Sequence, residues 1–160
     1  MNKDKMFSYH KWATLACLEH VQTFGKELYQ KEGINSFASI QATLEHVIGV
    51  EKLWLLRMSG ISKPAFEHFD VETIDKAIEA FMLLYAEMEL FFASLSQHQW
   101  QETLDYQNML GDDFSTTREE MLFTFVNHAS YHRGQITSFL RQFGKEGATL
   151  DYIYYQKQNR

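Results

Sequence analysis

The stretch that decides the fold is Phe125–Gly144, FVNHASYHRGQITSFLRQFG. Its apolar residues recur every three or four positions, which is the period of an α-helix with one buried face. These residues are Phe125, Ala129, Ile136, Phe139, Leu140 and Phe143. Gly144 stands where a left-handed C-terminal cap is expected. Thr116 and Glu119 match a capping box, so we predict that this helix begins near Thr116 and ends at Phe143.

Three further segments have the same helical period, and they cover residues 5–30, 37–58 and 71–96. Asn35 or Ser36 is expected to cap the second segment and Asp70 the third, because short polar side chains accept the free amide hydrogens of a first turn. Residues 97–114 indicate a short hairpin or an irregular crossover. Residues 148–158 are expected to form a short last segment that packs against the bundle through Leu150, Ile153 and Tyr154.

Four long amphipathic helices predict an all-α fold, a four-helix bundle. The longer, partly extended crossover precedes the last long helix. With 160 residues and neither an internal repeat nor a low-complexity tract, we expect one domain over residues 1–160. The apolar and aromatic stripes need no function to explain them, since such faces are what a helix buries.

Composition excludes several classes of function. Apolar residues make up 45% of the chain and charged residues 22%, which is typical of a soluble globular protein. The net charge of −6 and the lack of a Lys/Arg cluster argue against binding to nucleic acid or to an anionic membrane. No apolar run approaches the ~20 residues of a membrane helix. The single cysteine, Cys17, is expected to be a buried, inert thiol, and a cytoplasmic location is predicted.

The histidines carry the chemical information. His128 and His132 are four residues apart on the predicted helix, so their rings project from one face about one turn apart. Two imidazoles at this spacing can bind one metal ion. They can equally be buried histidines with satisfied hydrogen bonds. His46 lies between apolar residues of the second helix, and a third imidazole from a facing helix would give the three-ligand arrangement of catalytic zinc.

Other catalytic patterns are missing from the sequence. No Glu stands three residues before a His, so the carboxylate-bridged di-iron pattern of ferritin-like bundles is not present. There is no H-E-x-x-H, no cysteine pair, no phosphate-binding G-x-x-x-x-G-K-[ST] loop and no G-x-S-x-G elbow.

The sequence N-H-x-x-Y-H-R-G-Q-I, followed by L-R-x-x-G, resembles the last long helix of the DinB/YfiT-like family. Residues 39–54 resemble the second helix of that family, residues 9–13 its opening segment and residues 151–155 its closing one. The resemblance therefore spans nearly the whole chain. His10 departs from it, because many relatives carry Asn there.

This resemblance implies a four-helix bundle, often a homodimer, in which three histidines hold one divalent metal ion. Carried over by position, the ligands are His46, His128 and His132. Zn or Ni is favoured over Fe or Mn, although imidazole suits several transition metals. Glu45 and Glu51 are expected to be solvated charges rather than general bases.

The resemblance also gives roles to four neighbours of the histidines. Gln135 is a candidate to bind a ligand imidazole or the substrate. Arg133 is expected to attract an anion or to pair with a surface carboxylate, and Tyr131 is a weaker candidate. Gly134 either permits a close approach of a neighbouring segment or is a tolerated helical glycine.

Two classes of function stay open at this point. Some members of the family are thiol-dependent, which favours a metal-dependent S-transferase that joins a low-molecular-weight thiol to a small electrophile. Metal-dependent hydrolysis is the second enzymatic hypothesis. The non-enzymatic alternatives are a metal-binding or stress-response module, and a bundle whose histidines are satisfied without metal.

Overall fold

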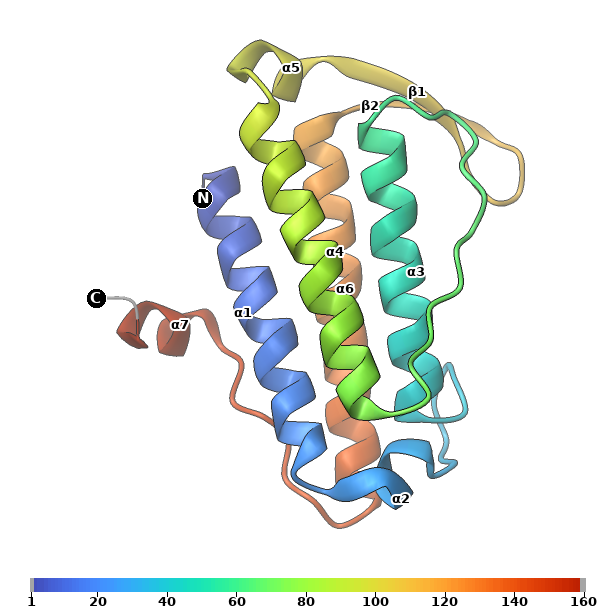
Figure 1. Cartoon of the computed structure of the whole chain (residues 1–160), viewed down its shortest axis with the longest axis vertical. Coiled ribbons are helices and arrows are strands. Elements are labelled where there is room, and N and C mark those ends of the chain that lie inside the picture. The colour runs from blue at the N-terminus through green and yellow to red at the C-terminus, as the bar shows by residue number, and fades with distance from the viewer. Residues whose placement is uncertain (1, 159–160) are drawn as a thin grey trace.

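The computed structural model describes residues 2–158 and confirms the all-α four-helix bundle (Figure 1). Its elements are, in chain order, α1 (Lys3–Gln22), α2 (Gly25–Gln30), α3 (Ile40–Met58), α4 (Ile74–Ser94), α5 (Gln97–Gln101), β1 (Thr103–Gln107), β2 (Asp113–Thr117), α6 (Arg118–Gln142) and α7 (Tyr152–Gln158). The long helices α1, α3, α4 and α6 form the bundle. None of the helices within residues 2–158 has both the length and the apolar character that a bilayer span requires.

Two long connections set the directions of the four helices. Residues 59–73 return along the length of the bundle, so that α3 and α4 run in the same direction, opposite to α1 and α6 (Figure 1). The α5 helix and the hairpin cross one end between α4 and α6. The α6 helix packs against α1 and α3, and α4 packs against the same two helices. As a result, α3 and α6 are antiparallel neighbours.

The crossover before α6 is an antiparallel hairpin, as its extended pattern indicates. Strands β1 and β2 pair from Thr103 with Thr117 to Gln107 with Asp113. Gly111 lies in the connecting turn with a φ of +90°, a left-handed conformation that favours glycine. The preceding helix α5 was not expected from the sequence, and its Ser96 and Gln99 form a capping box.

Three predicted helix starts lie too early. The α3 helix is capped by Ser39 and not by Asn35 or Ser36, and α4 is capped by Thr73 and not by Asp70. In α6 the capping box is Thr117 with Glu120, one residue beyond the predicted pair. Hydroxyl and carboxamide side chains near each boundary are chemically equivalent as caps, so the backbone path decides which one is used.

The predicted first helix, over residues 5–30, is divided in two. The α1 helix ends at Gln22, and α2 begins at Gly25, whose φ is +80°. A left-handed glycine turns the chain without steric cost, so the apolar period continues through a change of direction. Gly144, with a φ of +71°, follows the end of α6 as predicted.

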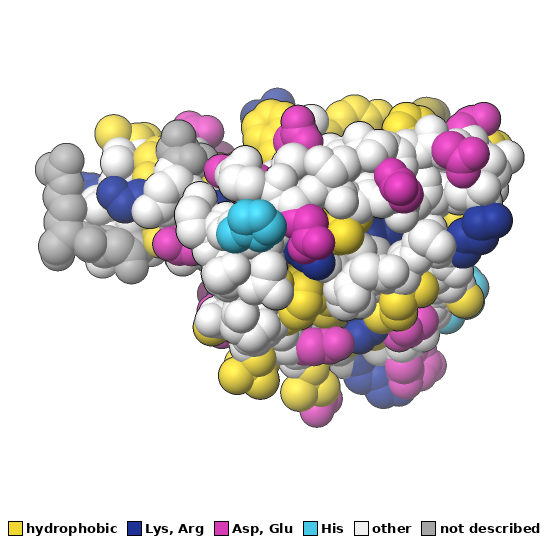
Figure 2. Space-filling model, turned by 90° about the horizontal axis from the view of Figure 1, so that it is seen from above, with side chains coloured by type: hydrophobic (Ala, Val, Ile, Leu, Met, Phe, Trp, Pro, Cys, Tyr) yellow, Lys and Arg dark blue, Asp and Glu magenta, His cyan; other side chains and the backbone are white. Residues whose placement is uncertain are grey.

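The C-terminal segment is only partly as expected. Leu150 packs against the core, and its carbonyl accepts a hydrogen bond from the Tyr9 hydroxyl at 2.8 Å. Ile153 and Tyr154 are exposed and do not pack inward, which corrects the prediction. Figure 2 shows this segment projecting from the side of the bundle. It is held against α1, where the Tyr9 ring packs edge-on against Tyr152 and Tyr155 and Trp12 Nε1 donates to Gln158 Oε1 at 2.9 Å.

Two helical glycines differ in what surrounds them, and this difference yields a stability prediction. A Cβ added at Gly134 would meet nothing within 4 Å, whereas one at Gly49 would lie 2.3 Å from the Phe66 ring. We expect Gly134→Ala to raise the free energy of unfolding by about 0.5–1 kcal/mol, because alanine favours a helix. Gly49→Ala is expected to lower it by roughly 1–3 kcal/mol through overpacking. Urea denaturation measures both, and equal effects would contradict the packing at Gly49.

Candidate metal centre

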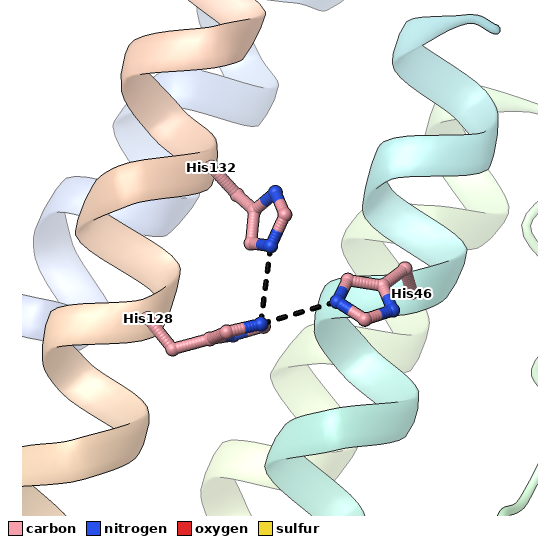
Figure 3. A group of neighbouring side chains, drawn as sticks. All are labelled: His46, His128 and His132. Carbon is pink, nitrogen blue, oxygen red and sulfur yellow. Dashed lines mark hydrogen bonds between the residues drawn. The ribbon is translucent and has the colours of Figure 1, made fainter. Parts of the chain in front are cut away.

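The α3 and α6 helices bring three imidazoles to one point (Figure 3). His128 and His132 project from successive turns of α6 toward α3, and His46 projects back from α3 between them. His46 and His128 are half-buried, and His132 is buried. The predicted convergence of these rings is therefore present, and that they hold a metal stays a prediction.

All three rings present their Nε2 atoms to one another. His128 Nε2 lies 3.1 Å from His46 Nε2 and 3.1 Å from His132 Nε2. The three candidate ligand atoms lie within 4.8 Å of one another. Two nitrogens bound to one tetrahedral ion at ~2.0–2.1 Å are roughly 3.3–3.4 Å apart. Two of the three nitrogen spacings are therefore close to those around a shared cation, and the third is no greater than 4.8 Å.

The hydrogen-bond chemistry of the cluster also fits a cation. His132 Nδ1 donates to Gln135 Oε1 at 2.7 Å, which leaves the His132 Nε2 as a lone pair. His128 Nε2 faces two other Nε2 atoms, and a single hydrogen can serve only one of them. Without a cation, only one of these two close contacts can therefore be a hydrogen bond.

Burial keeps the three rings neutral. It lowers the pKa of His46 to about 4 and that of His128 to about 4, and in both cases the neighbouring His132 adds a repulsive contribution. Burial also lowers the pKa of His132, while the bond to Gln135 opposes that shift. Neutral imidazole is the form that binds a metal, so the site is ready for a cation at neutral pH.

Gln135 contacts His132, one of the three candidate ligands, as predicted. Besides accepting from His132, its amide donates to the Tyr131 hydroxyl at 2.9 Å and to Ser36 Oγ at 2.6 Å. Such an outer contact fixes the tautomer and the orientation of a metal-binding ring. Tyr131 thus touches the site through Gln135, and its own side chain is mostly exposed.

Arg133 lies elsewhere than predicted. It is buried, and it pairs with no surface carboxylate among the described residues. Its Nη1 donates to His10 Nδ1 at 3.3 Å and to Thr14 Oγ1 at 3.0 Å, and its Nη2 donates to Ser130 Oγ at 2.7 Å. The guanidinium therefore turns away from the three histidines toward α1.

His10 joins Arg133 to a second buried charge. Its Nε2 lies 3.2 Å from Glu51 Oε1 and 3.2 Å from the Tyr85 hydroxyl. Glu51 is fully buried, which corrects the expectation that it is solvated. Since His10 Nδ1 accepts from Arg133, the ring proton belongs on Nε2, where it faces Glu51. Glu45, by contrast, pairs with the exposed His68 at 3.0 Å.

Gly134 permits no close approach, because nothing lies within 4 Å of the position of a Cβ there, so it is a tolerated helical glycine. Cys17 is buried as expected, and burial raises the pKa of its thiol to about 12.

Phe37 and Ser36, which both lie next to the histidines, were missed as site residues. They lie on a loop, where a single sequence offers no periodicity that could place them.

Comparisons with known proteins were consistent over nearly the whole chain. The sequence profile of the DinB family matches residues 1–160. The protein named DinB of Bacillus subtilis (strain 168) is 30% identical in an alignment that covers 94% of this chain and 91% of that protein.

Two solved structures share the fold. A DinB-like protein from Bacillus cereus superimposes with a TM-score of 0.69 at 16% identity and covers 90% of both chains. YfiT from Bacillus subtilis has a TM-score of 0.68 at 13% identity, over 90% of this chain and 89% of that one. YfiT is described as a probable metal-dependent hydrolase with an unusual four-helix bundle topology.

The lowered pKa values predict how acid affects the metal-free protein. In the folded chain His46 and His128 titrate at about 4, below their ordinary value of 6.5. Between these values the unfolded chain binds more protons, so the free energy of unfolding falls as the pH falls. We expect this contribution to stability to be fully present above pH 6.5 and lost near pH 4. Urea denaturation at stepped pH, in the presence of a chelator, measures it.

A double variant isolates this contribution. His46→Gln with His128→Gln is expected to flatten the pH dependence in this range. His68→Gln, which changes an exposed imidazole, serves as the control and should leave the pH dependence of the free energy of unfolding unchanged. An unchanged slope in the double variant would show that other groups cause the acid sensitivity.

Proposed function

Because this chain belongs to the DinB family, we propose that it holds one divalent metal ion at His46, His128 and His132 and acts as a metal-dependent hydrolase. The observation that carries the proposal is the meeting of three neutral imidazoles, in which His128 Nε2 lies 3.1 Å from both His46 Nε2 and His132 Nε2. No described carboxylate or thiol completes this group, so three protein ligands leave further coordination positions open to solvent and substrate.

A divalent ion bound here would supply Lewis-acid chemistry, which lowers the pKa of a water molecule and polarises a carbonyl group. The chain's own residues hold and orient the ligands for it. The three imidazoles carry no charge, so they leave the full double charge of the ion available. Gln135 Oε1 accepts a hydrogen bond from His132 Nδ1, which fixes the proton on that atom. The lone pair of His132 Nε2 is thereby left free to bind the ion.

Hydrolysis is preferred for two reasons. First, solvent water is a nucleophile that can always reach the open coordination positions of such a site. The fold is also shared with YfiT, the probable metal-dependent hydrolase. We propose Zn or Ni as the ion, with Fe or Mn as the less favoured choices, because a set of three imidazoles suits the later transition metals.

Thiol S-transfer is the second candidate. An ion that keeps its double charge among three neutral ligands attracts an external anion, and a thiolate is a soft anion that zinc binds readily. His46 and His128 are only half-buried, so a small thiol can reach them from solvent. In this reaction the thiolate sulfur of a low-molecular-weight thiol would bond to an electrophilic carbon, while the bond from that carbon to its leaving group breaks and the leaving group departs with the electron pair.

Metal analysis of untagged protein tests the site itself. We expect about one divalent ion per chain, and we expect a chelator to lower the melting temperature, because an ion that binds only the folded state stabilises it. His46→Ala with His132→Ala should abolish binding, because one imidazole remains. His68→Ala is the matched control and should retain the ion. Full metal content in the double variant would refute the ligand assignment.

A single assay separates the two reactions. Zn- or Ni-loaded protein is mixed with p-nitrophenyl acetate, with and without a thiol, and release of nitrophenolate is followed. Hydrolysis predicts a metal-dependent rate without thiol, whereas S-transfer predicts a rate only when thiol is present. In both cases His128→Ala should reduce the rate by at least a hundredfold, since it removes one ligand. Stoichiometric metal with no turnover would favour a metal-binding module.

A further inference from the structure

The loop of residues 31–39, which joins α2 to α3, is tied to α6 beside the metal centre. Gln142 on α6 forms two hydrogen bonds with the backbone of Ile34, each of 3.0 Å. Asn35 Nδ2 donates to the backbone carbonyl of Gln135 at 3.1 Å. Gln135 Nε2 donates to Ser36 Oγ at 2.6 Å. The loop is therefore fastened to the helix that supplies two of the three imidazoles.

Close packing against two phenylalanine rings fixes the same loop. A Cβ at Gly33 would lie 2.9 Å from the Phe139 ring and 3.1 Å from the Phe143 ring, so the backbone rests directly on α6. The Gly33 amide donates to the Ala38 carbonyl at 2.9 Å, which closes the loop on itself. These contacts leave residues 34–37 a defined position.

Phe37, in this loop, covers two of the imidazoles. Its ring centroid lies 4.5 Å from that of His46, with the planes 31° apart, and 5.7 Å from that of His132. The Phe37 side chain is only partly buried, so part of the ring remains open to solvent. An apolar surface thus lies against the rings of His46 and His132, two of the three imidazoles of the candidate site.

The Gln135 amide links this surface to a metal ligand. Its oxygen accepts from His132 Nδ1, and its nitrogen donates to Ser36 Oγ, the residue before Phe37. One planar group therefore sets both the orientation of the His132 ring and the position of the loop. A displacement of the loop would therefore change the orientation of the His132 ring, and a rotation of that ring would displace the loop.

We propose that Phe37 is the specificity-determining residue of the proposed reaction, and that it selects substrates with an aromatic or other apolar group next to the reacting carbonyl. Gln135 is the positioning residue that keeps Phe37 in register with His132. This inference rests on the proposed metal site. An apolar platform beside a cation favours a molecule that combines a metal-binding oxygen with a flat apolar group, because stacking and coordination then act together.

Two hydroxamates probe this arrangement without any turnover. Acetohydroxamate and benzohydroxamate share the same metal-binding group and differ in the apolar group attached to it. Calorimetric titration of Zn-loaded protein should show tighter binding of benzohydroxamate. In Phe37→Ala that affinity should fall about tenfold, which corresponds to the loss of one aromatic contact, while acetohydroxamate binding should change by less than about twofold.

Further variants distinguish selection from mere support of the site. Phe37→Leu keeps an apolar side chain and should retain most of the preference, which also guards against a folding defect in Phe37→Ala. Phe123→Ala removes an exposed phenyl ring elsewhere on α6 and should change neither affinity. Ser36→Ala cuts the link to Gln135 and should weaken benzohydroxamate binding while the metal is retained.

Each outcome bears on one claim. Equal losses for both hydroxamates, or no loss, in metal-loaded Phe37→Ala would overturn the role of Phe37 and leave the metal site standing. Failure of the wild-type chain to take up metal would overturn the proposed function itself. A selective loss of benzohydroxamate affinity supports the inference even if the ester assay shows no turnover.

Discussion

The meeting of three imidazole nitrogens between α3 and α6 is the constraint on which the functional part of this structure depends. His132 carries its proton on Nδ1, because Gln135 Oε1 accepts a hydrogen bond from that atom. His128 Nε2 faces the Nε2 atoms of both His46 and His132. Neutral rings in this arrangement can form only one hydrogen bond between their Nε2 atoms, whereas a cation among them could contact all three. The antiparallel contact of α3 and α6 creates this arrangement, and the two long connections make that contact possible.

The side chains of the neighbouring residues His132 and Arg133 belong to two separate polar networks on different faces of α6. Successive residues of a helix point about 100° apart, so His132 faces α3 while Arg133 faces α1. On the Arg133 side, the neutral His10 ring lies between the guanidinium and the buried carboxylate of Glu51. A buried pair of this kind adds little net stability, yet removal of one partner is costly. A rotation of α6 would break contacts on both sides.

The four long helices could be predicted from the sequence because each has one apolar face, which repeats at the helical period over five or more turns. The meeting of His128 and His132 on α6 could be predicted because four-residue spacing places two rings on one face, and that they bind a metal stays a prediction. The division of the first helix at Gly25 could not, since the apolar pattern continues through the turn. The burial of Glu51 was also missed, because its partners His10 and Tyr85 are 41 and 34 residues away in the chain.

Phe37 and Ser36 show why the surroundings of a site are harder to predict than its ligands. A ligand on a helix inherits its direction from the helical period, whereas a loop side chain takes its direction from contacts that are distant in sequence. Here those contacts are Gln135 and Gln142, which are about one hundred residues from the loop. The three candidate ligands belong to the helices α3 and α6, and the surface proposed to meet a substrate belongs to a loop fastened to α6. Variation in that loop can therefore change which molecules bind while the three imidazoles stay in place.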